Sequence, residues 1–556
     1  MISNKQFYSV IFLCIFTYLL GMFLIPLMDV DAAQYASISR EMLERNSFLQ
    51  VFDLGKDYLD KPPMLFWLSA LSMKIFGIYD WSYRLPSILL MIVSIYATYQ
   101  LAIIYYEKTV AQLSAIVLAS LQALFLMSHD VRTDTLLMSW VILGIWQLAK
   151  WYQLNKWTHF FLAFIFIGCG MMTKGPIALM VPGFAFLSHF VAQRNWKQLF
   201  RWEYLLGVIV IAIMLIPMSI GLYQQFDLHP GKLINNVPIQ SGLRFYYWTQ
   251  SFGRYTGENV YHEMSYFSFL LENMLWSFLP WIVFFLLGIV FSLRELIIQK
   301  FLIRSDQEFI TTGGFLLTYC ILAKSQAQLP HYIFVVYPLA AITTARILYG
   351  LFFTDRLLAW RKPLQLFHLV IFALLWIALI GLMFIPFPEI PLFVKIISII
   401  GFLVFIVLIF AQVKNFPKII ALGLYTVIGV NIFLSTAFYP NLLQFQMGND
   451  ANAFINKNAI DKNSVYLYGI NNSNALHFYG KHIFVNLSAT KAFEAHQIIL
   501  TEKDSTQFFK NIFPSSKVIH EGNQYPVSVL TGTFLNPSTR MKEMPRYVMI
   551  DLDGKP

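Results

Sequence analysis

The chain has 556 residues, of which 57% are hydrophobic, 17% are aromatic and only 13% are charged. Soluble domains carry about 25% charged residues, so this composition excludes a soluble multidomain enzyme. The formal net charge of +10 is typical of a membrane protein whose cytoplasmic loops are rich in Lys and Arg, and we expect no nucleic-acid partner.

Apolar runs of membrane-spanning length recur through the first 440 residues. A helix needs about 20 such residues to cross about 30 Å of hydrocarbon. No small-residue cleavage site ends the first run, so we expect a retained helix and not a signal peptide. We predict a polytopic α-helical membrane protein with about thirteen transmembrane helices, at residues 7–28, 84–106, 110–127, 134–152, 157–173, 176–193, 204–223, 266–292, 309–323, 330–353, 364–386, 392–412 and 418–439.

Two shorter segments near the N-terminus are predicted to lie at the membrane surface. Residues 31–45 place apolar side chains at helical spacing among polar ones, which indicates an amphipathic helix on the outer surface. Residues 62–77 are apolar but short, and they follow the pair Pro62-Pro63. We interpret this second segment as interfacial or re-entrant.

The loop charges predict the orientation of the chain. With the N-terminus in the cytoplasm, the cytoplasmic loops contain most of the loop Lys and Arg, and the opposite face contains most of the acids. An odd number of spans then places the C-terminus outside. We predict a multi-pass protein of the bacterial inner membrane with its polar candidate residues in the periplasm.

The composition changes near residue 440, where Asn, Ser, Lys, Asp and Glu become frequent. We predict two domains, a transmembrane domain with periplasmic loops at 1–440 and a small periplasmic α/β domain at 441–556. The predicted strands of the second domain cover 464–470, 482–487, 497–500 and 525–530, and its predicted helices cover 451–458 and 505–513.

Ionisable residues gather on the predicted outer face at six places, the last of which is Lys324 with His331 and Tyr332 at the outer end of the tenth predicted span. Asp31 follows the first run, Asp60-Lys61 precedes the two prolines, and Asp134 ends a polar group that starts at His129. Lys174 lies where two hydrophobic runs meet, and a long outer loop at 224–265 carries arginines beside aromatic residues. Helix capping, a structural salt bridge and a snorkelling Lys are the simpler interpretations of the individual sites.

Taken together, these residues supply carboxylates for base catalysis and cations for a phosphate. This combination favours an enzyme that acts on a lipid-phosphate-linked group at the outer surface. A lipid-linked-sugar flippase or another transporter is the alternative, but it would need charged residues along a transmembrane path.

Several motifs occur in an order that resembles the ArnT-like and protein O-mannosyltransferase-like glycosyltransferases of the GT-C class. They are D-A-A-Q-Y-A-S-I-S-R-E-M (31–42), Y-L-D-K-P-P-M-L-F-W (58–67), R-L-P (84–86), R-T-D-T-L-L (132–137), T-K-G-P (173–176) and Q-L-P-H-Y-I (328–333). Two positions depart from the usual pattern, because Asp31-Ala32 stands in place of Asp-Glu and Asp60-Lys61 in place of Glu-Lys.

The resemblance implies an inverting glycosyltransferase that moves a sugar from an undecaprenyl-phosphate donor to an acceptor at the periplasmic face. Lipid A is the first acceptor it suggests, with aminoarabinose or a related sugar, and a protein or another envelope glycan is the alternative. The implied roles are catalytic for Asp31 and Asp134; donor-phosphate binding for Lys61, Lys174 and Arg254; and lining of the substrate cavity for Tyr35, Asp60 and Tyr332.

The sequence itself requires no cofactor. In the family, the acid at the position of Asp60 is associated with zinc, so the resemblance leaves a zinc ion at Asp60 as an alternative. One further hypothesis makes the C-terminal domain a binding module that chooses the acceptor, with the membrane part as the enzyme.

Overall fold

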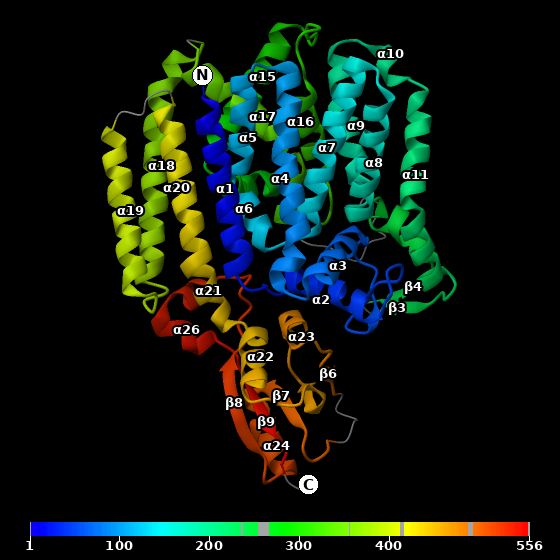
Figure 1. Ribbon diagram of the computed structural model, residues 1–556, viewed down its shortest axis with the longest axis vertical. Helices are drawn as coiled ribbons and strands as arrows, with labels where there is room; N and C mark the ends of the chain where they lie inside the picture. Colours follow the sequence, from blue (N-terminus) through cyan, green and yellow to red (C-terminus); the bar gives the residue numbers. More distant parts are fainter. Residues whose placement is uncertain are drawn as a thin grey trace.

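The computed structural model describes residues 2–234, 237–253, 266–354, 356–411, 416–487 and 493–553. Within these residues, long helices form a bundle, and a small sheet is attached to one end of it (Figure 1). The N-terminus lies at the other end of the bundle, far from the sheet and the C-terminus (Figure 1).

The helices of the bundle follow the predicted apolar runs. In the first half they are α1 (Asn4–Leu24), α4 (Asp80–Tyr105), α5 (Lys108–Ala119), α6 (Gln122–His129), α7 (Thr133–Leu154), α8 (Trp157–Lys174), α9 (Ile177–Ala192), α10 (Trp196–Leu199) and α11 (Glu203–Leu222). After α11 they are η1 (Tyr223–Asp227), α12 (Gly242–Arg244), η2 (Phe245–Thr249), α14 (Phe269–Ser277), α15 (Ile282–Ile298), α16 (Ile310–Ala323), η3 (Pro330–Val336), α17 (Tyr337–Phe352), α18 (Leu358–Phe384), α19 (Leu392–Phe410), α20 (Lys418–Phe433), η4 (Leu434–Phe438), α21 (Tyr439–Leu442) and η5 (Leu443–Phe445).

Eight helical stretches of the described chain are long and apolar enough to cross a membrane, and the count becomes nine if the bent pair α5 and α6 is one span. The chain is therefore a membrane protein with the helical architecture expected from its composition. Each of the predicted runs overlaps a helix, but several of these helices, such as α9 and α16, are shorter than a full span.

Two of the predicted runs are broken helices, and their breaks lie against each other. The run at 110–127 bends by 50° between α5 and α6, and the run at 266–292 is divided into α14 and α15. At the contact, the Gln122 N–H donates to the Leu279 carbonyl at 3.1 Å, and Trp281 Nε1 donates to Ser120 Oγ at 2.8 Å. Each break thus supplies hydrogen-bond partners to the other, which backbone in a membrane needs.

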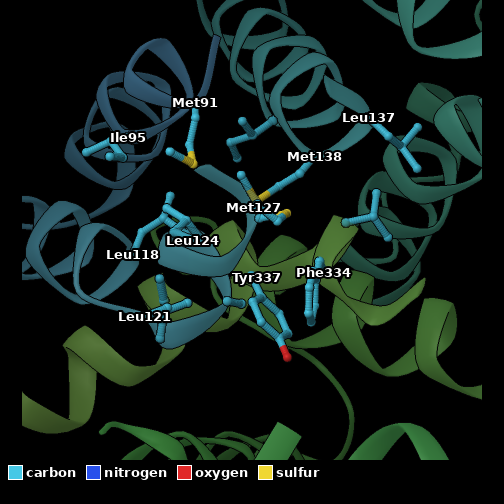
Figure 2. Close-up of a cluster of buried hydrophobic side chains, with 14 of the residues drawn as sticks. Met91, Ile95, Leu118, Leu121, Leu124, Met127, Leu137, Met138, Phe334 and Tyr337 are labelled. Carbon is cyan, nitrogen blue, oxygen red and sulfur yellow. The ribbon is translucent and has the colours of Figure 1, made fainter. Parts of the chain in front are cut away.

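The core of the bundle is apolar and lies between α4, α5, α6, α7 and α17. Figure 2 shows the packing of its side chains, which include Met91, Leu118, Leu124, Met138 and Tyr337. These residues are buried. The packing fixes the ends of α6 and α7, and the short segment that joins these two helices carries several of the predicted site residues.

The two predicted surface segments are helices at the end of the bundle that carries the sheet (Figure 1). They are α2 (Asp31–Glu44) and α3 (Met64–Phe76). Helix α3 exposes Leu71, Ile75 and Phe76, as an interfacial helix would. Helix α2 differs from the prediction of a surface helix, because α3 packs on one side of it and the C-terminal part packs on another, so that most of its side chains are buried.

The part of the chain after η5 contains the five-stranded sheet. The strand order is β6 (Val485–Asn486), β5 (Val465–Tyr468), β7 (Ile498–Glu502), β9 (Arg546–Asp551) and β8 (Lys517–Asn523). β5 is parallel to β6 and β7, whereas β9 is antiparallel to β7 and β8. The short helical elements around it are α22 (Met447–Lys457), η6 (Lys462–Ser464), α23 (Asn474–Gly480), η7 (Lys503–Ser505), α24 (Thr506–Ile512), α25 (Gly532–Leu535) and α26 (Pro537–Glu543). Two small antiparallel hairpins lie in the first half of the chain, β1 (Phe52–Asp53) with β2 (Lys56–Asp57) and β3 (Lys232–Ile234) with β4 (Val237–Ile239).

One strand of this part was predicted wrongly and two were missed. Residues 525–530 are not a strand, because the Tyr525 ring stacks on Phe534 with 3.8 Å between centroids and the Tyr525 N–H donates to the Phe445 carbonyl at the end of the bundle. The missed strands β8 and β9 pair with each other, and β9 lies between β7 and β8. The other predicted strands and helices coincide with β5, β6, β7, α22 and α24.

A buried carboxylate joins the C-terminal part to the bundle. Asp29, just after α1, accepts hydrogen bonds from Ser473 Oγ at 2.5 Å and from the Ala475 N–H at 2.9 Å, at the beginning of α23. Burial raises the pKa of Asp29 to about 6, against the lowering effect of these hydrogen bonds. Tyr479 of the same helix accepts from the Leu27 N–H at 2.8 Å, so α23 is fixed to the end of α1 at two points.

Candidate functional site

A cavity lies at the end of the bundle that carries the sheet, between α7, α8 and the loops that follow α2 and η1. Five of the predicted site residues line it, namely Asp60, Lys61, Asp134, Lys174 and Tyr332. Most of its other lining side chains are apolar or aromatic, and they include Leu137, Ile177, Met180, Phe245, Tyr246, Phe252, Ile321 and Leu322. The cavity therefore combines two lysines and two carboxylates with an apolar wall.

The first ion pair of the cavity joins α7 to α8. Lys174 Nζ lies 2.5 Å from Asp134 Oδ1 and 4.1 Å from the centroid of the Tyr332 ring. Asp134 is in the first turn of α7 and Lys174 is in the last turn of α8. Each side chain is therefore stabilised by the opposite partial charge at its own helix end. Gly175 ends α8 at φ 91°, a conformation that glycine adopts without strain. His331 completes the group, with Nε2 3.5 Å from Asp134 Oδ2.

The second ion pair lies across the cavity, in the loop before α3. Lys61 Nζ is 2.7 Å from Asp60 Oδ2, and Gln250 Nε2 donates to both the carbonyl and Oδ1 of Asp60 at 2.9 Å. Lys61 is mostly buried, with a side chain 16% exposed, whereas Asp60 is 43% exposed. The prolines that follow hold this loop in place before α3 begins at Met64.

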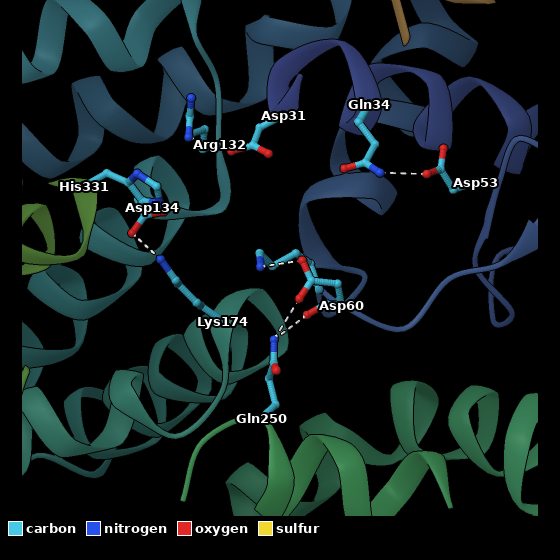
Figure 3. A network of polar contacts seen from close by, with 10 residues as sticks. Asp31, Gln34, Asp53, Asp60, Arg132, Asp134, Lys174, Gln250 and His331 are labelled. Carbon is cyan, nitrogen blue, oxygen red and sulfur yellow. Dashed lines mark hydrogen bonds and ion pairs between the residues drawn. The ribbon is translucent and has the colours of Figure 1, made fainter. Parts of the chain in front are cut away.

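A third group of charges lies beside the cavity and is centred on Arg132. Its Nη1 is 2.6 Å from Asp31 Oδ2, and its Nε is 2.9 Å from Asp130 Oδ2. Burial opposes the charge of Arg132, but the two carboxylates outweigh it and raise the pKa of the guanidinium. Arg132 thus keeps a positive charge and orients the Asp31 carboxylate. Figure 3 shows Asp31, Asp60, Asp134 and Lys174 around one common space.

A buried arginine positions the segment that carries these charges. Arg84 of α4 is fully buried, and its guanidinium donates to the His129 carbonyl at 2.9 Å and to the Met22, Ile25 and Pro26 carbonyls at 2.6–3.0 Å. It therefore ties the end of α1 to the end of α6. Tyr83 OH adds a hydrogen bond to the Val131 carbonyl at 2.9 Å, which fixes the segment between His129 and Asp134.

A second cavity shares Asp134 with the first. Asp130, Arg132 and His331 also line it, and its apolar wall includes Met127, Trp276 and Tyr439. Val527, Ser528 and Leu530 from the C-terminal part also line it. Asp134 is thus reached from two cavities, one with lysines and one with Arg132.

The structure does not bring all the predicted site residues into the first cavity. Asp31 is connected to the second cavity through Arg132. Tyr35 is 3% exposed, and its ring packs on Phe66 of α3, because the side of α2 that bears it is covered by that helix. It is therefore not among the residues that line the first cavity. Arg254 lies outside the described residues.

Three residues of the site were given no role from the sequence. They are Arg132, Gln250 and His331, which hydrogen-bond or pair with Asp31, Asp60 and Asp134. Arg132 and His331 lie inside the quoted motifs at 132–137 and 328–333, so their motif position was a usable signal. Nothing in the sequence distinguishes Gln250 from other polar residues of its loop.

The described residues around Asp60 do not fit a zinc ion. Zinc sites use three or four His, Cys, Asp or Glu ligands, and no group of three such residues that could hold a metal occurs in the described part of the chain. Both carboxylate oxygens of Asp60 already accept hydrogen bonds, from Lys61 and Gln250. We therefore assign no metal-dependent step to this site.

Comparisons with known proteins relate the chain to glycosyltransferases. Residues 60–220 match the family described as dolichyl-phosphate-mannose-protein mannosyltransferase. The chain is also similar to proteins named undecaprenyl phosphate-alpha-4-amino-4-deoxy-L-arabinose arabinosyl transferase. The protein from Enterobacter sp. (strain 638) is 24% identical over 284 residues, 50% of this chain and 48% of the relative. The protein from Pseudomonas aeruginosa (strain UCBPP-PA14) is 26% identical over 292 residues, 50% of this chain and 49% of the relative. The aligned part of the chain spans about half the length of these curated relatives.

Solved structures with the same fold extend the comparison to the whole chain. The crystal structure of ArnT from Cupriavidus metallidurans bound to undecaprenyl phosphate has a TM-score of 0.73 at 16% identity, and all of both chains is covered. An oligosaccharyltransferase from Archaeoglobus fulgidus, in complex with zinc and sulfate, has a TM-score of 0.51 at 12% identity, with 90% of this chain and 69% of that chain covered. The resemblance inferred from the motifs is thereby confirmed: the chain has the GT-C fold of the ArnT structure, and its sequence is similar to the arabinosyl transferases.

Proposed function

We propose that this protein is a membrane glycosyltransferase that moves a sugar from undecaprenyl phosphate to an acceptor, with aminoarabinose and lipid A as the first candidates. The names of the similar arabinosyl transferases and the undecaprenyl phosphate bound to the similar ArnT structure support this donor class. The family match over residues 60–220 supports glycosyl transfer and makes a protein acceptor the alternative.

The first cavity is the observation that carries the proposal. A polyprenyl phosphate sugar has a charged phosphate and a long apolar chain. Lys61 and Lys174 supply two cations on opposite sides of the cavity, and the apolar wall of Leu137, Ile177 and Met180 offers a surface for isoprene units. Lysine binds phosphate as a point charge, and the partly dry surroundings strengthen that attraction.

The proposed reaction is a single displacement. The acceptor oxygen attacks the anomeric carbon, the bond from that carbon to the phosphate oxygen breaks, and undecaprenyl phosphate leaves with the electron pair. Lys61 and Lys174 stabilise the charge of the leaving phosphate. Asp31, oriented by Arg132, accepts the proton of an acceptor hydroxyl or orients an acceptor phosphate. The proposed role of Asp134 is to hold Lys174 in position from the point where the two cavities meet.

The second cavity is the proposed acceptor site. Arg132 gives it a positive charge that suits a phosphorylated acceptor, and Met127, Trp276 and Tyr439 give it an apolar wall that suits a lipid. Val527, Ser528 and Leu530 of the C-terminal part also line it. We infer that this part, as a separate domain at 441–556, contributes to the choice of acceptor.

The proposed topology has thirteen spans, with the N-terminus in the cytoplasm and the C-terminal domain in the periplasm. Helices α2 and α3, whose flanking segments carry Asp31, Asp60 and Lys61, lie at the same end of the bundle as the sheet (Figure 1), and this supports the arrangement. A flippase would need its charges along a path through the bundle, whereas the charges of the described site gather at one end.

The test is mass spectrometry of lipid A from cells that lack the protein and carry wild type, Asp31→Asn or Asp53→Asn. Asp53 is the matched control, because it is a nearby buried carboxylate that hydrogen-bonds Gln34. We expect wild type and Asp53→Asn to restore a sugar-sized mass. Asp31→Asn should lose about 10²–10⁴-fold of the transfer rate, as expected for loss of a general base.

Two results would contradict parts of the proposal. If Asp31→Asn restores the modification at the normal rate, Asp31 has no catalytic role. If wild type never changes lipid A, lipid A is not the acceptor, and analysis of glycosylated envelope proteins becomes the next measurement.

A further inference from the structure

Residues of the last turns of α15 and α17 line another cavity. These turns lie at the end of the bundle opposite the sheet (Figure 1). Three arginines line it, namely Arg294, Arg346 and Arg356. They come from α15, from α17 and from the segment after α17, so the fold brings together cations that are up to 62 residues apart. Glu295 is the acid that lines the same cavity, which leaves an excess of positive charge.

Arg346 is the fixed arginine of this cavity. Its Nη1 donates to Ser292 Oγ at 3.3 Å, its Nη2 lies 3.7 Å from Glu295 Oε2, and its guanidinium lies 5.3 Å from the Tyr106 ring centroid. Its side chain is only 25% exposed. These contacts hold the guanidinium at the wall of the cavity in a defined orientation.

The other two arginines are available to a ligand. Within the part of the chain that the structure describes, neither Arg294 nor Arg356 forms an ion pair. Both are exposed residues that line the cavity beside Arg346. Two cations without an acidic partner next to a third that is fixed form a suitable site for a phosphate group.

The surroundings of the cavity suit the rest of a phospholipid. Phe291 and Ile298 of α15 line it, and Ile298 is 67% exposed. Trp360 at the beginning of α18 contacts Phe291, with 6.5 Å between ring centroids, and is 48% exposed. Trp is frequent at the level of lipid headgroups, so the cations lie beside apolar side chains that acyl chains can contact.

We propose that this cavity binds the phosphate of an anionic phospholipid on the side of the membrane opposite the candidate site. Cations scattered over a membrane surface attract anionic lipids only as a diffuse layer, whereas a basic pocket between transmembrane helices retains individual headgroups. Arg294, Arg346 and Arg356 converge on one cavity and therefore constitute such a pocket. The site is independent of the proposed sugar transfer.

The test is native mass spectrometry of the full-length protein released from nanodiscs that contain equal amounts of phosphatidylglycerol and phosphatidylethanolamine. The variant is the double substitution Arg294→Gln with Arg356→Gln. The matched control is Lys300→Gln with Lys362→Gln, which removes two exposed charges outside the cavity. Each cation near an anionic surface contributes on the order of tenfold or less, so we expect the cavity variant to retain about 10- to 30-fold less phosphatidylglycerol than wild type. The control should retain it as wild type does.

Three outcomes would overturn the proposal. Equal retention by wild type and the cavity variant would exclude a role for these arginines. Equal loss in the cavity variant and in the control would show diffuse surface attraction only. Stabilisation by inorganic phosphate alone, with no preference for phosphatidylglycerol, would show that the cavity takes the free anion and not a lipid. Thermal unfolding is measured for wild type, the cavity variant, the control and Arg346→Lys. It separates a loss of binding from a loss of folding.

Discussion

The inner and outer helices of the bundle differ in what surrounds them and in what they carry. The most apolar stretch of η3 and α17 is 89% buried in the protein, whereas the most apolar stretch of α19 is 6% buried. The inner stretch contains Thr343, Thr344 and Arg346, while α19 is almost entirely aliphatic and aromatic. The more hydrophobic helix is thus the less buried one.

This difference arises because lipid surrounds the outer helices, whereas other helices surround the inner ones. Hydrocarbon cannot hydrogen-bond, so helices that face lipid exclude polar side chains. Helices enclosed by other helices can place polar groups where partners exist, as Asp134 of α7 does with Lys174 of α8. The chemistry of the protein is therefore expected on the inner helices, and each prediction below compares an inner site with an outer one or with a site at the junction.

The largest effect is expected from Asp134→Asn. The neutral amide cannot balance the Lys174 charge, so the lysine loses the partner that holds it at the cavity. We expect kcat/KM for a synthetic undecaprenyl-phosphate sugar to fall about 10²–10³-fold in proteoliposomes, as expected for loss of one electrostatic stabiliser of the leaving phosphate. The control on the outer helix is Lys395→Gln, which also removes one charge and should leave the rate unchanged. A normal rate in Asp134→Asn, with normal thermal unfolding, would exclude the carboxylate from the reaction.

A smaller effect is expected from the same truncation in an inner and an outer helix. Leu118 of α5 is 0% exposed, and Leu403 of α19 is 54% exposed. Leu118→Ala leaves a cavity in the core of Figure 2 and should cost about 2–5 kcal/mol. Leu403→Ala faces lipid, which fills the space, so it should cost under about 1 kcal/mol. Unfolding titrations in mixed detergent micelles measure both, and equal costs would contradict the comparison.

The sequence predicts the inner and the outer helices equally well, but it does not predict whether protein or lipid surrounds them. Long apolar runs such as 330–353 and 392–412 predict helices because nothing else satisfies the backbone in a membrane. Which face of a run meets protein depends on neighbours far along the chain. For this reason α2 was predicted as a surface helix, although α3 and α23 cover it.

The candidate site shows the same limit. The motifs predicted Asp60, Lys61, Asp134, Lys174 and Tyr332, which line the first cavity, because polar motifs stand out against apolar runs. The pairing of these residues could not be read from the sequence, since Asp134 and Lys174 are 40 residues apart and Asp60 and Gln250 are 190 apart. In the C-terminal part, β9 was missed because it pairs with β7 over a separation that local patterns do not report.

The smallest effect is expected at the junction between the bundle and the C-terminal part, where protein and not lipid surrounds the carboxyl group of Asp29. The pKa of Asp29 is raised by burial from 3.8 to about 6. Between about pH 4 and pH 6 the docked state therefore holds the Asp29 proton more tightly than an undocked state would. The stabilisation is fully present below about pH 4, decreases as the pH rises to about 6, and is constant above that. A shift of two units corresponds to about 3 kcal/mol at most.

Asp29→Asn should remove this dependence, because the amide keeps an oxygen that accepts from the Ala475 N–H but has no proton to lose. Thermal unfolding at pH 4.5, 5.5 and 7 should show wild type losing about 1–3 kcal/mol of stability across this range relative to the variant. Asp53→Asn is not a suitable control here, because the pKa of Asp53 is also raised by burial to about 6. Asp461→Asn, in the exposed residue that precedes η6, serves as the control instead. The stability of this variant should depend on pH as that of wild type does. Parallel curves for wild type and Asp29→Asn would mean that the junction keeps Asp29 charged, and the contacts of α23 with the bundle would then be insensitive to pH in this range.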